Sequence, residues 1–190
     1  RDEGVTDLLS AGDFVEGHWG IDTNKTGVFG PVSTPEQKRA AVKLAGDTYY
    51  PQVMQRFSSR GFTLYPALGD HEIGDNDWTL KDGGIEAFKY NNLGLYKRTY
   101  STHIMQSSPG VHRFVDRPFG PANGTAYATR PHSDVQLIAL DVFQKTNVDV
   151  IAELDYRQLN WVERVLKKAN ADGVKWIIVQ GHTPIISPVN

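Results

Sequence analysis

Apolar residues gather in four short runs along the chain, and polar or mixed segments separate these runs. They cover residues 5–11, 62–68, 135–140 and 174–179. Each run has strand length and is rich in β-branched or aromatic residues, so each predicts a buried β-strand.

Three helices are expected between or beside these strands. Thr34, Pro35 and Gln37 form a capping-box pattern that starts a helix, which we expect to continue to about residue 59, before Gly61. A shorter helix is expected over residues 84–93. Asp155, with Gln158 as its capping-box partner, starts the third helix. The apolar face of this third helix consists of Leu159, Trp161, Val162, Val165, Leu166 and Ala169.

Residues 94–131 contain four prolines, many aromatic residues and short β-like pieces such as 111–115 and 125–129. We expect them to form antiparallel strands and loops beside the main sheet. Because strands and helices alternate elsewhere, the sequence predicts an α/β fold with a layered mixed β-sheet flanked by helices. The chain shows no internal repeat and no linker, so residues 1–190 are expected to form a single domain.

Composition limits the chemistry that this chain can carry out. The net charge of −2 and the pI near 6.3 give no nucleic-acid-binding signature. No apolar run approaches the ~20 residues of a membrane span. The chain has no cysteine, so any metal must be bound by carboxylates, imidazoles or carbonyl oxygens.

Three of the four apolar runs end near a glycine that is followed directly by an ionisable side chain. These segments are Gly12-Asp13, Gly69-Asp70-His71-Glu72 and Gly181-His182. Strands adjacent in one sheet would place Asp13, Asp70 and His182 together at one edge, where ligands bind in open α/β sheets. A bound cation would neutralise the two carboxylates, and this donor set suits Zn, Mn or Fe. Each segment taken alone would more often be a simple turn than a metal ligand, but three of them in one chain are hard to explain as turns.

The order and spacing of these segments resemble the calcineurin-like metallophosphoesterase family. Gly12-Asp13 matches its second motif, residues 69–72 match its Gly-Asn-His-Asp/Glu motif, and Gly181-His182 matches its fourth, before the apolar residues 185–186. The resemblance implies a layered α/β/β/α sandwich and hydrolysis of a phosphomonoester or phosphodiester by a metal-activated hydroxide. It also favours a secreted or periplasmic location, and its substrate would be a small phosphate ester.

The same resemblance implies a role for each site residue. Asp13 would bridge two divalent or trivalent metal ions, and Asp70 and His182 would ligate the second ion. His71 would contact the phosphate and help to protonate the leaving oxygen, while Glu72 would hold the imidazole ring of His71.

The chain departs from the family pattern in two ways. Asp70 stands where the family has Asn, and the extra negative charge should tighten metal binding and raise the optimal pH. The family's first motif, Asp-x-His, and its last motif, Gly-His-x-His, are absent, because Asp7 lies too close to Asp13 and the chain ends at Asn190. We therefore expect the N-terminal and C-terminal parts of the domain to be missing, and a non-catalytic domain with an incomplete metal site remains the alternative function.

Other residues carry weaker expectations. His18 and Trp19 follow Asp13 in a long Gly-rich loop, where they could line a substrate cleft or simply pack within the loop. Asp75 and Trp78 are expected in a solvated loop. Structural roles are expected for His103, His112 and His132. A serine hydrolase or a dinucleotide-binding enzyme is disfavoured, since neither Gly-x-Ser-x-Gly nor Gly-x-Gly-x-x-Gly occurs.

Overall fold

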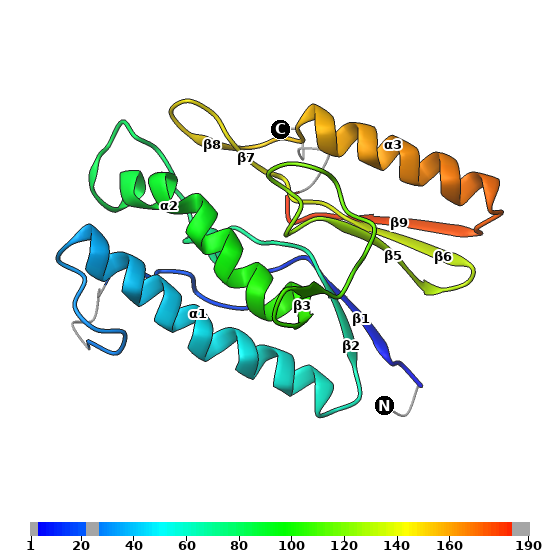
Figure 1. Ribbon diagram of the computed structural model, residues 1–190, viewed down its shortest axis with the longest axis horizontal. Helices are drawn as coiled ribbons and strands as arrows, with labels where there is room; N and C mark the ends of the chain where they lie inside the picture. The colour runs from blue at the N-terminus through cyan, green and yellow to red at the C-terminus, as the bar shows by residue number, and fades with distance from the viewer. Residues whose placement is uncertain (1–3, 22–26, 184–190) are drawn as a thin grey trace, which may run out of the picture.

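A mixed α/β fold is seen in the computed structural model, which describes residues 4–21 and 27–183 (Figure 1). The helices within these ranges are α1 (Pro35–Ser58), α2 (Gly84–Tyr100) and α3 (Tyr156–Ala171), with a 3₁₀ turn at His71–Ile73 and a π-helical turn at Ser101–Met105. The strands are β1 (Asp7–Ser10), β2 (Thr63–Pro66), β3 (Gln106–Ser108), β4 (Val111–His112), β5 (Tyr127–His132), β6 (Val135–Ala139), β7 (Phe143–Lys145), β8 (Val150–Ala152) and β9 (Trp176–Gln180). The apolar residues 185–186 of the fourth motif lie outside the described ranges.

The first half of the chain forms a β1–α1–β2 unit with a parallel strand pair, as predicted. Leu8 lies opposite Leu64 and Ser10 lies opposite Pro66. The capping box at the start of α1 is confirmed. The Thr34 side chain accepts a hydrogen bond from the backbone N–H of Gln37, and the Gln37 side chain accepts one from the backbone N–H of Thr34. Helices α1 and α2 lie side by side (Figure 1).

The second half is built on a separate sheet in the order β5–β6–β9, in which β6 pairs antiparallel with β5 and parallel with β9. The expectation that the three glycine-ended strands share one sheet is therefore wrong, because β9 pairs with β6 rather than with β1 or β2. The two sheets approach each other where the Gln180 side chain donates a hydrogen bond to the backbone carbonyl of Tyr65, at 2.9 Å. Helix α3 lies alongside the second sheet (Figure 1).

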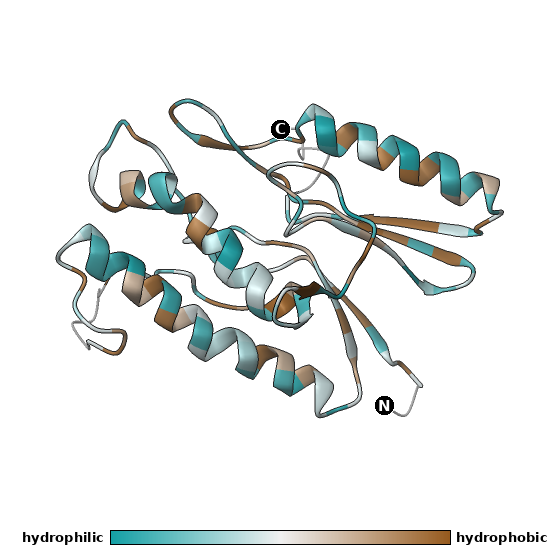
Figure 2. Ribbon diagram, viewed as in Figure 1, coloured by the Kyte–Doolittle hydropathy of each residue, from teal (hydrophilic) through white to brown (hydrophobic). Residues whose placement is uncertain are grey.

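Strand β9 is apolar but is not buried, which corrects the sequence prediction. Figure 2 shows the hydrophobic colouring along this strand. Trp176 and Ile178 on one face are 67% and 36% exposed, and Ile177 and Val179 on the other are 41% and 40% exposed, so neither face of this edge strand is covered in the described part of the chain. Leu9 in β1 is also 47% exposed. Strands β2 and β6 are buried, as predicted.

Helix α2 is longer than predicted and continues through Gly94 to Tyr100. Leu93, Tyr96 and Tyr100 are buried at helical spacing, and this packing outweighs the low helix propensity of glycine. The prediction of strands and loops for residues 94–105 is therefore wrong. Of the expected strands, only residues 111–112 and 127–132 pair as such.

Gln158 does not complete the predicted capping box of α3. The Asp155 side chain does accept a hydrogen bond from the Gln158 backbone N–H. The Gln158 amide instead bonds the backbone N–H and C=O of Asp141, at 2.9 and 2.8 Å, because the helix start lies beside the end of β6. On the predicted apolar face, Trp161 and Val165 are buried, whereas Leu159 is exposed.

Buried side chains form one contiguous cluster from Trp19 to Val165, with contributions from α1, α2, β2, β5 and β6. Among the described helices, none is both long enough and apolar enough to cross a membrane.

Candidate metal centre

Three strand ends converge at the point where the two sheets meet. Asp13 follows β1, Asp70 follows β2 and His182 follows β9. Although β9 belongs to the other sheet, the Nε2 atom of His182 lies 3.0 Å from Asp70 Oδ1 and 3.6 Å from Asp13 Oδ2. One ligand-type atom from each residue lies within 4.8 Å of the others, so the structure brings together the three side chains that the sequence singled out as metal ligands.

The ring of His182 is oriented by the backbone. Its Nδ1 lies 2.9 Å from the carbonyl oxygen of Ala11. A carbonyl can only accept a hydrogen bond, so Nδ1 carries a proton and Nε2 is the ring nitrogen that faces the two carboxylates. In histidines that ligate metals, the ring nitrogen that is not bound to the metal donates a hydrogen bond in this way.

The carboxylates of Asp13 and Asp70 are held differently. Asp70 accepts hydrogen bonds from the His71 backbone N–H at 3.0 Å and from the Asn76 side chain at 2.6 Å. Asp13 adopts a left-handed backbone conformation, with φ of 60°, and its side chain is 38% exposed. Partial burial raises the pKa of the Asp13 carboxyl, the charge of Asp70 raises it further, and His182 opposes the shift. A bound cation would remove this repulsion between the carboxylates.

Glu72 does not hold the ring of His71, which corrects the role implied by the resemblance. The Glu72 side chain is fully buried and accepts hydrogen bonds from the backbone N–H groups of Asp13, Phe14 and Gly69, each at 2.8 Å. Neighbouring residues of a 3₁₀ turn point in different directions, so Glu72 turns into the protein while His71 faces out. Burial raises the pKa of Glu72, and the three hydrogen bonds oppose that shift. Glu72 therefore joins the loops after β1 and β2.

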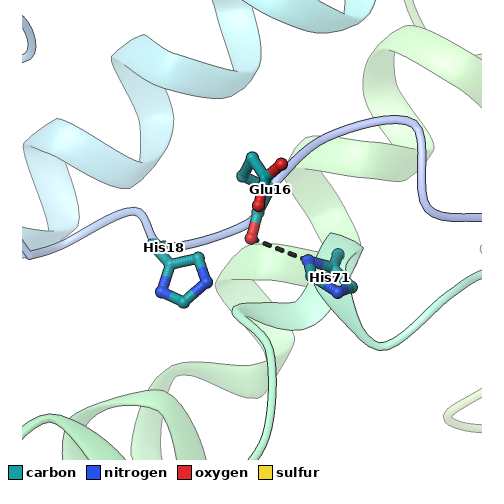
Figure 3. Close-up of side chains that lie close together, drawn as sticks. All are labelled: Glu16, His18 and His71. Carbon is teal, nitrogen blue, oxygen red and sulfur yellow. Dashed lines mark hydrogen bonds between the residues drawn. The ribbon is translucent and has the colours of Figure 1, made fainter.

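The ring of His71 is held instead by the backbone of Glu16. Figure 3 shows the hydrogen bond between His71 Nδ1 and the Glu16 carbonyl oxygen, which is 2.8 Å long. Burial alone would lower the pKa of His71, but this hydrogen bond and the nearby carboxylates outweigh it and raise the pKa above its ordinary value. Those carboxylates belong to Asp13, Asp75 and Asp70.

A second group of ligand-type side chains lies beside the first. Atoms of Glu16, His18 and His71 lie within 4.8 Å of one another (Figure 3). His18 Nε2 is also 3.0 Å from Asp75 Oδ2, and His71 Nε2 is 4.0 Å from Asp75 Oδ1. Sequence reasoning missed Glu16 and expected Asp75 in a solvated loop. Glu16 and His18 follow Asp13 within five residues in the same loop, and this closeness in sequence could have identified them as neighbours of the centre.

Glycine is required where the strand-end loops touch. A Cβ atom on Gly12 would lie 2.4 Å from the backbone nitrogen of Gly69, and one on Gly69 would lie 2.2 Å from Asp13 Oδ1. A Cβ atom on Gly17 would lie 1.9 Å from the carbonyl oxygen of His71. These close contacts bring Asp13, Asp70 and His71 to one place.

His18 and Trp19 border an open cleft of about 750 Å³, which also reaches Asp13 and His71. The two residues differ in exposure: the His18 side chain is 51% exposed, whereas Trp19 is 7% exposed and packs against Tyr50. His18 therefore lies at the surface of the cleft, and Trp19 is part of its base.

The remaining histidines lie away from this centre. His103 Nε2 bonds Asp47 at 2.8 Å, and the Nδ1 atoms of His112 and His132 accept hydrogen bonds from nearby backbone N–H groups. Trp78 is buried, and its indole N–H donates to the carbonyl of Ile73, so its expected place in a solvated loop is wrong.

Comparison with protein-family models, with curated proteins and with solved structures finds no match to this chain.

Proposed function

We propose that this protein is a metal-dependent hydrolase of phosphate esters. The observation that carries the proposal is the convergence of Asp13, Asp70 and His182 at three strand ends, with His71 directly beside them. The order of the motifs, which resembles the calcineurin-like metallophosphoesterases, supplies the reaction class. The same proposal interprets the two sheets, with α1 and α2 beside one and α3 beside the other, as the layers of an α/β/β/α sandwich.

The residues of this centre fit a divalent or trivalent cation. They offer two carboxylates and one imidazole nitrogen, a donor set that suits Zn, Mn or Fe. A cation bound at such a site lowers the pKa of water and neutralises charge on phosphate oxygens. We assign the cation to Asp13, Asp70 and His182 because this group offers two carboxylates beside one imidazole, whereas the second group offers a single carboxylate, that of Glu16.

His71 acts on the phosphate ester in this proposal. Its Nδ1 donates to the Glu16 carbonyl, so Nε2 is the ring nitrogen that can face the ester. Its raised pKa keeps the imidazole protonated to a higher pH than usual. A protonated His71 donates a hydrogen bond to a phosphate oxygen and transfers its proton to the leaving oxygen.

A domain that binds the cation without turnover is the alternative function. It uses the same three ligands but gives His71 no chemical role. Metal content and hydrolysis, measured together on the same preparations, separate the two functions.

The test combines metal analysis with hydrolysis of phenyl phosphate and diphenyl phosphate, whose leaving groups are poor enough to benefit from protonation. Asp13→Ala should lose both the bound cation and the activity. His71→Ala should keep the cation and lose about 10²–10⁴-fold in kcat, the usual contribution of general acid catalysis. His132→Ala, a histidine far from the centre in sequence and bonded only locally, is the matched control and should keep both.

Two results would contradict the proposal. Unchanged hydrolysis in both Asp13→Ala and His71→Ala would exclude this centre as the active site. A stoichiometric cation without hydrolysis of either ester would favour the cation-binding alternative.

A further inference from the structure

The open cleft beside the candidate metal centre reaches from Asp13 and His71 to helix α1. Residues 13–21 and 28–32 form one side of it, and residues of α1 between 41 and 56 form the other. Its volume of about 750 Å³ lies in the range of small-molecule binding sites. An ester whose phosphate lies at Asp13 and His71 would therefore extend its organic part into this cleft.

Apolar and aromatic side chains form one part of the cleft wall, and polar groups expose a similar area. Trp19 stacks on Tyr49 with ring centroids 6.3 Å apart, and Phe29 meets Tyr49 edge-on at 5.5 Å. These ring contacts join the loop to α1 and fix the shape of the wall. Phe14, Val15 and Val53 are partly buried and extend the apolar surface between the rings and the metal centre.

Charged groups in the cleft are unevenly placed. Arg56 is the single lysine or arginine among the described residues that line it, whereas Asp13 and Glu16 contribute carboxylates and His18 and His71 contribute imidazoles. A polyphosphate chain would find a single guanidinium here, apart from the cation and His71. Along the part of the wall formed by Trp19, Phe29 and Tyr49, a sugar would find few hydrogen-bond partners.

We infer that the substrate is a phosphate ester of a ring-bearing apolar alcohol or phenol, whose ring occupies this cleft. This inference rests on the proposed function for its chemistry, but binding in the cleft can be measured without turnover. Aromatic ligand rings pack well against aromatic walls of this kind.

The experiment compares two esters, phenyl phosphate and 2-naphthyl phosphate, whose leaving groups have similar acidity but differ by one ring. The metal-loaded protein should have a kcat/KM at least about tenfold higher for the naphthyl ester, since even one methylene in an apolar pocket is worth about that factor. Calorimetric titration with the non-hydrolysable phenylphosphonate and 2-naphthylphosphonate measures binding separately.

Two glutamines of α1 provide a matched pair of variants. Gln52 is exposed and lines the cleft, whereas Gln55 is exposed on the same helix and does not. Gln52→Trp should fill the cleft and reduce the naphthyl preference to within about twofold. Gln55→Trp should leave the preference unchanged. Because both positions are exposed, neither variant should prevent folding.

Each outcome decides the inference. If both esters are hydrolysed equally well and Gln52→Trp has no effect, the inference is overturned while the proposed function stands. If neither ester is hydrolysed, the proposed function fails. The inference about the cleft then depends on the phosphonates: preferential binding of the naphthyl compound that Gln52→Trp abolishes supports it, and equal or absent binding overturns it.

Discussion

Glu72 is a buried carboxylate with three backbone N–H donors, and its removal should be costly. In Glu72→Gln the amide nitrogen would face backbone N–H groups that need an acceptor. We expect the free energy of unfolding to fall by about 2–4 kcal/mol, because buried backbone N–H groups would lose the charged carboxylate that accepts their hydrogen bonds. Urea denaturation measures this change. Glu163→Gln, at an exposed position, should leave the free energy of unfolding essentially unchanged. Equal stability of the two variants would show that Glu72 does not hold the loops together.

Asp70 tests whether this centre binds a cation through carboxylates. In Asp70→Asn the amide oxygen can still act as a ligand, but one negative charge is lost, so cation affinity should fall about tenfold. Titration with Mn²⁺ or Zn²⁺ in competition with a chelating dye gives the dissociation constants. An unchanged constant would mean that Asp70 is not a ligand.

The two neighbouring groups of ligand-type side chains can be told apart by their histidines. His182→Ala should abolish stoichiometric binding, since His182 is the imidazole of the first group. His18→Ala should leave it intact, because His18 belongs to the second group. Metal analysis after dialysis provides the measurement. Loss of the cation in His18→Ala but not in His182→Ala would show that Glu16, His18 and His71 bind the cation instead.

The candidate ligand residues could be found in the sequence, but the contacts that hold them in place could not. Asp13, Asp70 and His182 follow apolar runs directly after or near glycine, a pattern that is visible without a structure. The direction of Glu72 depends on the 3₁₀ turn, and the contact between Glu16 and His71 joins residues from two loops. No local pattern records contacts of this kind.

At the scale of elements, Asp47 ties helix α1 to the turn that follows α2. Its carboxylate lies 2.8 Å from His103 Nε2 and also pairs with Lys43. Partial burial raises the pKa of Asp47, but its hydrogen bonds and electrostatic contacts with Lys43 and His103 outweigh burial and lower this pKa below its ordinary value of 3.8. Since the folded-state pKa is the lower one, this stabilisation is present above about pH 3.8 and is lost as the pH falls through the folded-state pKa.

Asp47→Asn should therefore lower the melting temperature only where Asp47 is charged. We expect a decrease of about 1–3 °C at pH 6, because a partly exposed ion pair contributes about 0.5–1 kcal/mol. At pH 2 the two proteins should have the same melting temperature. Thermal scans at both values check this, and a difference that persisted at pH 2 would point to packing rather than charge.

Packing explains why two elements differed from their predictions. Gly94 was expected to end α2, but Leu93 and Tyr96 on either side of it are buried and keep the helix continuous. The apolar run at residues 174–179 predicted a buried strand, yet burial depends on what packs against the two faces of the strand, and both faces of β9 are exposed. Periodicity identifies an element but does not give its neighbours.

At the scale of the whole molecule, β2 connects the two halves through its carbonyl groups. One edge of β2 pairs with β1, and side chains from elsewhere bond to its carbonyls and to that of Ala67. The donors are Arg113 to Leu64, Gln180 to Tyr65, Tyr127 to Pro66 and Tyr100 to Ala67. These long-range bonds position β9, and with it His182, against the loops after β1 and β2.

Gln180→Ala should weaken both stability and cation binding. It leaves the Tyr65 carbonyl without this donor and loosens the strand that carries His182, so we expect a loss of about 1–3 kcal/mol in unfolding free energy. Gln144→Ala is the matched control, since the Gln144 side-chain oxygen has no hydrogen-bond partner among the described residues. Denaturation and metal titration should separate the two variants, and equal behaviour would contradict the role of Gln180.

The contact between Gly12 and Gly69 also limits how this chain can change. Each position lacks room for a single methyl group, and the obstacle is backbone or a site carboxylate rather than a movable side chain. In a saturation library selected for activity, both positions should therefore retain only glycine, even when the other is varied at the same time. Positions 27 and 110, where a Cβ atom would meet nothing within 4 Å, should accept asparagine and other residues that tolerate a positive φ.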